Sequence, residues 1–571
     1  MKEHLKNLIQ KAKGEKQSEL VLKNANIVNV FTGEIIKSSV AIDNGIIVGI
    51  GDYNGEVEID LDGAYLSPGF VDSHVHIESS MSSPSQFAKV IVPRGVTSII
   101  ADPHEIANVK GLDGIRYIID ESKKSPLDVY IALPSCVPAT NFENSGAILL
   151  AEDLATLLKE ESVICLGEMM DYPGVISYDD KVLDKLVLAK DMVIDGHGPM
   201  ITGKELNAYI VAGVKTEHES STLKEAEERL RLGMYILLRE GSAARDLRNL
   251  ISLVNKDNLR RFLFCTDDKH PEDLIREGTI DFNIKLAIKA GVDPVDAIRM
   301  ATINAAECYG LKKKGAIAPG YRADLVVIGD LNKVDIKMVF KDGKLVAKDN
   351  KPLFDPVPYL PEYMKNSVKL ARIKVEDLAL HLTSKSANVI GIVPDSLVTE
   401  KLVLNIDSDN GVFNYSEEDI SKLVVVERHK GTGNIGIGLI KGFHIENGAI
   451  GSTIAHDSHN ILVAGDNDAD ILQVIKELEN IGGGITIVRN GKVLKSLPLE
   501  IGGIMTSGDI QNTNTILKEM MKISYEELKV NPAIDPFMTL AFMALPVIPK
   551  LKLTDMGLFD VEEFKFIPIS N

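Results

Sequence analysis

The sequence is poor in cysteine and in long apolar runs. Its 571 residues include four cysteines, Cys136, Cys165, Cys265 and Cys308, which are scattered and form no Cys-x-x-Cys pair. This usage argues against a disulfide framework and a thiolate zinc site, and fits a reducing compartment such as the cytoplasm. No stretch approaches the roughly 18 consecutive apolar residues of a membrane-spanning helix, and the charged N-terminal segment lacks the apolar core of a secretory signal. We therefore expect a cytoplasmic protein that does not contact a membrane.

Positive charge is also scarce. Lys and Arg total 63 against 82 Asp and Glu, which gives a formal net charge of −19, and no basic run interrupts this pattern. A polyanion such as a nucleic-acid backbone is therefore not an expected partner. A small-molecule substrate is the remaining expectation.

The chain is long enough for about three domains. Residues 1–68 and 315–355 contain short β-rich runs with hairpin signals at Asn44-Gly45 and Asp342-Gly343, so we expect them to form one small β-sandwich domain. A proline-rich linker follows, and residues 365–571 mix strand and helix patterns, as in a separate α+β domain.

Residues 69–314 alternate strand-like and helical patterns, which is typical of parallel βα units. The eight strand-like runs are GFVDSHVH, VTSIIADPH, DVYIALPSC, VICLGEMMD, MVIDGHGP, VKTEHE, MYILLREGS and RFLFCTDD. Eight such units over about 240 residues predict an α/β fold, a (β/α)8 barrel. We expect its last helix to begin at Asp293-Pro294 and to run without a break to Gly310.

Metal-competent side chains stand at the ends of these runs. Residues two apart on a strand share a face, so His74 and His76 can reach one ion; an isolated pair of this kind is more often solvated or hydrogen-bonded. The other runs end similarly, with Asp102 and His104, Glu168 and Asp171, His197, Glu217, His218 and Glu219, and Asp267 and Asp268. Because the carboxyl ends of barrel strands meet at one face, the joint pattern favours a metal site.

Four histidines and two carboxylates at these ends form a ligand set for two divalent ions. They are His74, His76, Glu168, His197, His218 and Asp267. Imidazole and carboxylate together suit Mn, Fe or Zn. Glu168 could bridge the two ions, although Asp171 competes for this role. Such a pair would activate water for attack on carbon, and Asp267 could pass the proton to the leaving group.

Several motifs together resemble the adenine deaminases of bacteria and archaea, within the amidohydrolase superfamily. They are PGFVDSHVHIESSM, ADPHEIANV, GEMMD, DGHGP, TEHE and FCTDDKHP, and the similarity extends over nearly the whole chain. The resemblance implies a binuclear centre on the six residues above, with Mn2+ favoured over Fe2+ or Zn2+. It also implies hydrolysis of adenine to hypoxanthine and ammonia in purine salvage, by a metal-bound hydroxide that attacks C6, and a homo-oligomer, with a dimer favoured. Glu168 replaces the carbamylated lysine of many superfamily members, which supports the narrower group.

The residues that contact the substrate are not decided by the sequence. Asp268, Glu105, Glu219 and His104 are the candidates. In the C-terminal domain, the segments IAHDSHN and IGGIMTSG are expected to close over the barrel mouth, with polar surface loops as the alternative. A cyclic amide or another aminopurine is the alternative substrate, and a noncatalytic scaffold is the third possibility.

Overall fold

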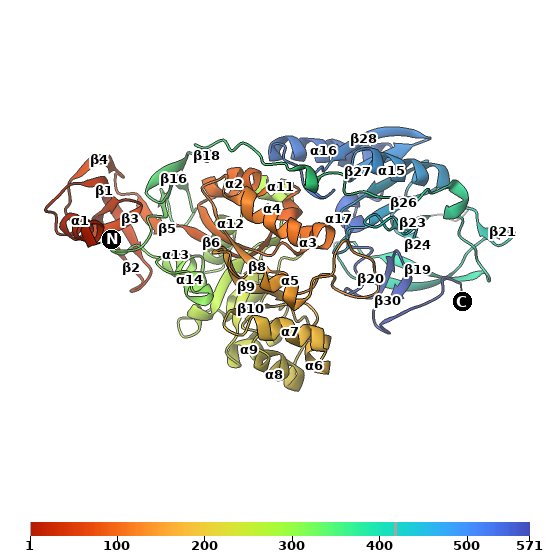
Figure 1. Ribbon diagram of the computed structural model, residues 1–571, viewed down its shortest axis with the longest axis horizontal. Helices are drawn as coiled ribbons and strands as arrows, with labels where there is room; N and C mark the ends of the chain where they lie inside the picture. The colour runs from red at the N-terminus through yellow and green to blue at the C-terminus, as the bar shows by residue number, and fades with distance from the viewer. Residues whose placement is uncertain (1, 395, 416–418, 571) are drawn as a thin grey trace.

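The computed structural model describes residues 2–394, 396–415 and 419–570. Figure 1 shows an elongated molecule, with the N-terminal sheet at one end, the barrel in the middle and the C-terminal residues at the other end. A short helix, α1 (Lys2–Ala12), lies against the N-terminal sheet. Within the described residues, no helix has both the length and the apolar character needed to cross a membrane.

The residues before and after the barrel contribute to one nine-stranded sheet. Its strands are β1 (Ser18–Asn29), β2 (Glu34–Asp43), β3 (Ile46–Ile50), β4 (Gly55–Asp60), β5 (Tyr65–Pro68), β15 (Leu325–Ile328), β16 (Ile336–Lys341), β17 (Lys344–Lys348) and β18 (Lys351–Pro352). β5 pairs antiparallel with β15, which joins the residues before the barrel to those after it. Asn44 and Asp342 take positive φ values of 49° and 48°, as their hairpin turns require.

The barrel strands occur within all eight predicted runs. They are β6 (Phe70–His76), β7 (Val96–Ala101), β8 (Asp128–Leu133), β9 (Val163–Met169), β10 (Val193–Gly196), β11 (Thr216–Glu217), β12 (Tyr235–Arg239), β13 (Phe262–Cys265) and β14 (Asp267–Asp268). Neighbouring strands pair in parallel, and a bridge between Ile194 and Val214 links β10 to the strand that follows. The eighth run is divided between β13 and β14, and β14 closes the ring by pairing with β6.

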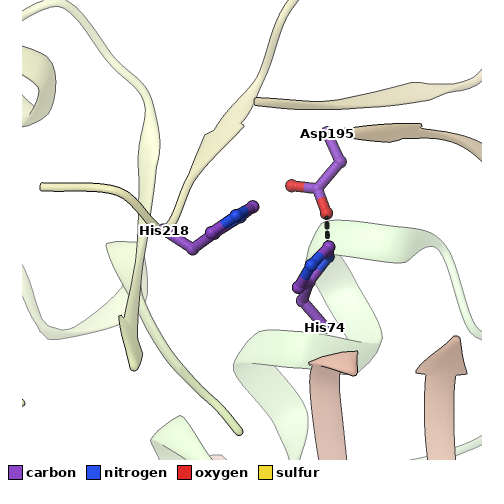
Figure 2. A group of neighbouring side chains, drawn as sticks. All are labelled: His74, Asp195 and His218. Carbon is purple, nitrogen blue, oxygen red and sulfur yellow. Dashed lines mark hydrogen bonds and ion pairs between the residues drawn. The ribbon is translucent and has the colours of Figure 1, made fainter. Parts of the chain in front are cut away.

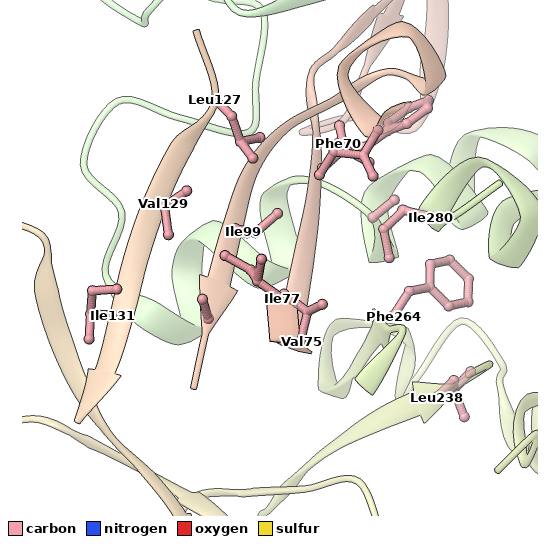
Figure 3. Packing of buried hydrophobic residues seen from close by; sticks show 14 of the residues in the cluster. Phe70, Val75, Ile77, Ile99, Leu127, Val129, Ile131, Leu238, Phe264 and Ile280 are labelled. Carbon is pink, nitrogen blue, oxygen red and sulfur yellow. The ribbon is translucent and has the colours of Figure 1, made fainter. Parts of the chain in front are cut away.

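Helices surround this ring. They are α2 (Pro84–Ile91), α3 (His104–Lys110), α4 (Leu112–Ser122), α5 (Ala151–Ala155), α6 (Tyr172–Ser177), α7 (Asp180–Leu188), α8 (Gly203–Val211), α9 (Leu223–Arg231), α10 (Leu247–Leu250), α11 (Pro271–Arg276), α12 (Ile280–Lys289), α13 (Pro294–Met300) and α14 (Ile303–Tyr309). Figure 3 shows one side of the strand–helix layer, where Phe70, Val75 and Ile99 pack near Ile280 of α12.

The interior of the ring is filled by a second apolar cluster. Val71, Ile100, Cys165, Leu237 and Leu263 belong to it and are each at most 2% exposed. These side chains fill the interior of the ring, which is therefore a packed core rather than a channel. Burial of each aliphatic side chain contributes about 1.5–3 kcal/mol to the stability of the fold.

The prediction of one continuous last helix was wrong. The structure has two helices, α13 and α14, which are separated at Ala301 and Thr302. The carbonyl of Ala301 accepts a hydrogen bond from the amide of Val71 in strand β6 at 2.8 Å. This carbonyl is therefore engaged by the strand instead of by a hydrogen bond that would continue the helix. The predicted ends are correct, because Asp293 accepts from the amide of Val295 at 2.9 Å and Gly310 has a φ of 68°.

The C-terminal residues form an α+β domain around an eight-stranded sheet. Its strands are β19 (Ser386–Ile392), β20 (Thr399–Asn405), β23 (Ile420–Val426), β24 (Ile435–Lys441), β25 (Gly448–Ser452), β26 (Ile461–Gly465), β27 (Gly484–Arg489) and β28 (Lys492–Pro498). The other elements are β21 (Ser408–Asp409), β22 (Val412–Phe413), β29 (Leu551–Thr554), β30 (Gly557–Asp560), β31 (Lys565–Phe566), α15 (Asp468–Asn480), α16 (Ile510–Glu526) and α17 (Pro536–Ala541). The loop between β25 and β26 reaches the barrel mouth.

Candidate active site

Glu168 lies at the centre of the predicted ligand set, at the end of β9. Its Oε1 is 3.3 Å from His76 Nε2, and its Oε2 is 2.6 Å from His197 Nδ1 and 3.1 Å from His218 Nε2. The two strand-one imidazoles approach each other, with His74 Nε2 3.1 Å from His76 Nε2. The two oxygens of one carboxylate therefore face two different groups of imidazole nitrogens.

Asp267 completes the set from the strand that closes the barrel. Its Oδ1 lies 3.0 Å from His76 Nε2 and 3.7 Å from His74 Nε2. Its Oδ2 accepts a hydrogen bond from Arg239 Nη1 at 2.8 Å. Burial raises the pKa of the Asp267 carboxyl, but hydrogen bonding to His76 and the charge of Arg239 hold this pKa well below its usual value.

The ring orientation of the strand-one histidines is fixed from behind. His74 Nδ1 lies 2.8 Å from Asp195 Oδ2, as Figure 2 shows, and His76 Nδ1 lies 2.9 Å from the carbonyl oxygen of Asp102. With its Nδ1 proton engaged in this way, each imidazole presents the lone pair of Nε2 to the centre. The His218 ring stacks on His74, with centroids 4.2 Å apart.

The donor set fits divalent cations. Several groups of side chains have ligand atoms close enough to share one ion. Two of these groups include Glu168: His74, His76 and Glu168, and Glu168, His197 and His218. All of these residues except His197 are buried. Converging imidazole nitrogens and carboxylate oxygens in a buried place need a cation or protons to balance them, and this mixture of N and O donors is typical of Mn, Fe and Zn sites.

Two residues in this region were missed by the sequence analysis. Arg239, at the end of β12, contacts Glu219 and also donates to Asp246 at 3.0 Å. Asp195, at the end of β10, contacts His74 and Thr216. Both lie at the carboxyl ends of predicted strands, which was the available signal.

The competing carboxylate Asp171 has a different place. It lies at the N-terminus of α6, where it accepts from the amide of Gly174 at 2.8 Å. Asp171 is absent from the groups of converging ligand atoms described above, whereas Glu168 belongs to both. The geometry therefore favours Glu168 over Asp171 as the shared carboxylate.

The four candidates for substrate contact are found on different sides of the centre. Glu219 is held by Arg239, and Asp268 accepts from Ser79 Oγ. His104 Nδ1 is 3.4 Å from Glu168 Oε1. Glu105 points to the C-terminal domain instead, where it contacts two histidines.

The structure brings both predicted C-terminal segments onto the barrel. In the first, His456 Nδ1 and His459 Nε2 contact the two oxygens of Glu105, and Asp457 Oδ1 is 4.0 Å from His104 Nε2. In the second, the amide of Thr506 donates to the carbonyl of Met81 at 2.9 Å. These contacts close the barrel mouth.

A small hollow of about 20 Å3 lies between the barrel mouth and the C-terminal domain. Ile454, Ile504 and Phe537 form part of its apolar wall, and Glu78, Glu105 and His456 supply polar groups. Apolar walls with a few polar groups are typical of the lining of small-molecule sites. We refer to it as the interdomain hollow.

Residues 65–346 match the amidohydrolase family, and residues 396–565 match the adenine deaminase C-terminal domain. The adenine deaminase of Clostridium acetobutylicum is 50% identical over 566 residues, which cover 98% of this chain and 99% of the relative. The adenine deaminase of Geobacillus kaustophilus is 49% identical, over 99% of each chain.

The chain belongs to the adenine deaminase family. Solved structures of other amidohydrolases are less similar to this chain than the two adenine deaminases are. An enamidase structure has a TM-score of 0.44 and 21% identity, and covers 59% of this chain and 98% of its own. A D-hydantoinase (dihydropyrimidinase) from Thermus sp. has a TM-score of 0.47 and 18% identity, and covers 59% of this chain and 97% of its own.

Proposed function

We propose that this chain hydrolyses adenine to hypoxanthine and ammonia, with the strand-end carboxylates and imidazoles of the barrel mouth as its catalytic centre. Membership in the adenine deaminase family over the full length supports the reaction. The single observation that carries the choice of site is the convergence of Glu168 with the four predicted ligand histidines.

The proposed centre holds two divalent ions, with Mn2+ favoured and Fe2+ or Zn2+ as alternatives. His74, His76, His197, His218, Glu168 and Asp267 are the proposed ligands. Bound ions would lower the pKa of water and neutralise charge that develops at the reacting carbon. The two groups of ligand atoms that share Glu168 support two ions rather than one.

Asp267 is the proposed proton carrier. Its Oδ1 faces the imidazole nitrogens, where the attacking water would lie, while Oδ2 is held by Arg239. Asp267 takes one proton from the water as the C6–O bond forms. It then delivers this proton to the exocyclic nitrogen, so that ammonia leaves as the C6–N bond breaks. Oxygen replaces nitrogen at C6, and the carboxylate is restored.

An assay of ammonia release tests this proposal. The enzyme purified with Mn2+ should deaminate adenine and should act much more slowly on adenosine, guanine and hydantoin. H76A should lose bound metal and turnover together, measured by mass spectrometry of the metal and by ammonia release. A preference for guanine or hydantoin over adenine would overturn the assignment of the substrate, and inactivity of the fully metallated protein would overturn the reaction.

The same proposal includes the cellular setting. We place the enzyme in purine salvage in the cytoplasm, which is consistent with four free, buried cysteines. We also propose a homo-oligomer, with a dimer favoured. Val187 on α7 and Val211 on α8 are apolar and exposed, at 67% and 87%, and could contribute to contacts between copies. Light scattering at micromolar concentration would give the mass, and a monomer would contradict this part.

A further inference from the structure

The C-terminal domain supplies one imidazole that has a ring nitrogen available to a molecule in the interdomain hollow. His456 is 5% exposed and lines this hollow. Its Nδ1 contacts Glu105 Oε1, and its ring stacks on Phe542 with centroids 4.4 Å apart and planes 19° apart. The carboxylate and the phenyl ring together fix the position and rotation of the imidazole. Within the described ranges, Nε2 has no protein hydrogen-bond partner.

His459 contacts the same carboxylate but has no nitrogen to spare. Its Nε2 contacts Glu105 Oε2, and its Nδ1 accepts from the amide of Ala455 at 3.3 Å. An imidazole that accepts at Nδ1 carries its proton on Nε2, so His459 is a neutral donor to Glu105. Ligand atoms of Glu105, His456 and His459 lie close together. The proton on His459 Nε2, however, occupies the position from which this nitrogen would bind a cation. A hydrogen-bonded cluster accounts for this geometry without a third ion.

The cluster therefore leaves His456 as the charged partner of Glu105. Burial lowers the pKa of His456, but the Glu105 carboxylate outweighs this effect and raises it to about 9. Both ring nitrogens of His456 are donors at neutral pH. Arg428 fixes the loop, because its Nε donates to the carbonyl of His459 and its Nη2 donates to that of Gly502 at 3.0 Å.

We propose that His456 is a catalytic residue contributed by the C-terminal domain, with its Nε2–H donating a hydrogen bond to a ring nitrogen of the purine. This inference rests on the proposed deamination of adenine. Addition of oxygen at C6 converts the C6=N1 double bond to a single bond and moves negative charge onto the N1–C2–N3 unit. A rigid donor at that edge stabilises the transition state more than the bound substrate. The proton remains on His456 throughout.

Two substitutions separate the two ring nitrogens. In H456N the amide nitrogen takes the place of Nδ1 and keeps the contact with Glu105, but the Nε2 donor is lost. In H456Q the amide nitrogen reaches the place of Nε2 and the Nδ1 contact is lost. We expect H456N to lower kcat by about 10²-fold, as the loss of one preorganised donor does. H456Q should retain more activity than H456N.

A matched control lies behind the same loop. His429 is buried, its Nε2 lies 2.7 Å from the carbonyl of Ser458, and it does not belong to the lining of the hollow. H429Q keeps a donor to that carbonyl, so its kcat should stay close to that of the wild type. Metal content and thermal unfolding of all variants should match those of the wild type.

Binding of adenine analogues tests the contact itself. We expect wild-type enzyme to bind either 1-deazaadenine or 3-deazaadenine about 10-fold more weakly than adenine, the value of one hydrogen bond. H456N should lose this difference in affinity. The affinity for 7-deazaadenine relative to adenine should be the same in H456N and in the wild type. The proposal is overturned if H456N keeps wild-type kcat and discrimination, or if both His456 variants weaken all four ligands equally. Wild-type enzyme that neither binds nor deaminates adenine would instead overturn the proposed function, and this inference with it.

Discussion

Arg239 donates to one oxygen of Asp267 at 2.8 Å, while the other oxygen of this carboxylate lies 3.0 Å from His76 Nε2. One side of Asp267 is thus fixed by an ion pair and the other side faces the proposed metal centre. Arg239 also contacts Glu219, so it joins the ends of three neighbouring strand runs. The guanidinium carries the charge that balances this buried group of carboxylates.

Removal of the Arg239 charge should damage both stability and turnover. R239M leaves Asp267, Glu219 and Asp246 without their shared cation, and breaking a buried pair of this kind costs about 3–5 kcal/mol. R239K keeps the charge but not the planar fork, so it should be more stable than R239M. Thermal unfolding and ammonia release measure the two effects. An R239M protein as stable and active as the wild type would show that Asp267 does not depend on this pair.

Asp195 should control metal affinity without touching the metal. Its Oδ2 lies 2.8 Å from His74 Nδ1, and D195N would replace this acceptor with an amide that can present the wrong atom. Loss of such a partner behind a metal ligand typically costs about 10–100-fold in affinity. Metal competition with a coloured chelator measures the change.

T216V gives a graded control for the same contact. It removes the hydroxyl that contacts Asp195 but leaves the carboxylate in place, so its effect on metal affinity should be smaller. If D195N binds metal as tightly as the wild type, the orientation of His74 does not require Asp195.

Lys552 should make stability depend on pH above neutrality. The side chain is fully buried, its Nζ donates to the carbonyls of Leu397 and Phe542, and burial lowers the pKa of this amine to about 7. The unfolded chain keeps the proton up to a pH of about 10.4. The unfolded state therefore binds more protons between these values, so this group makes folding more favourable as pH rises, by up to about 1.4 kcal/mol per pH unit.

The variant K552M isolates this contribution. The wild type should gain stability relative to K552M between pH 7 and pH 10, measured as the difference in their melting temperatures at each pH. Phe542 supports His456, so activity should be recorded in parallel. A difference that stays constant over this range would mean that Lys552 keeps its ordinary pKa in the folded protein.

The barrel and its strand ends could be predicted because both depend on local sequence. Apolar runs form strands, the ring closes at a fixed number of units, and residues such as His76 and His197 follow the last apolar position of their runs. The break between α13 and α14 could not be predicted, because it depends on a hydrogen bond from Val71, which lies far away in the sequence.

Contacts between distant segments account for the other omissions. Asp195 and Arg239 stand at strand ends like the predicted ligands, but nothing in their own segments tells which neighbouring strand they face. Glu105 and His456 are 351 positions apart, and their contact exists only because the C-terminal domain packs on the barrel mouth. The sequence could indicate that the segment carrying His456 approaches the barrel, but not which ring nitrogen stays available.

Metal titration of the apoenzyme tests the central claim most directly. Ammonia release from adenine and bound Mn2+ would be measured together as the chelated protein is reloaded. We expect activity to rise until two ions are bound per chain, and we expect E168Q, which lacks the shared carboxylate, to bind fewer ions and to stay inactive. Full activity of the metal-free wild type, or an E168Q titration that matches the wild type, would contradict the account.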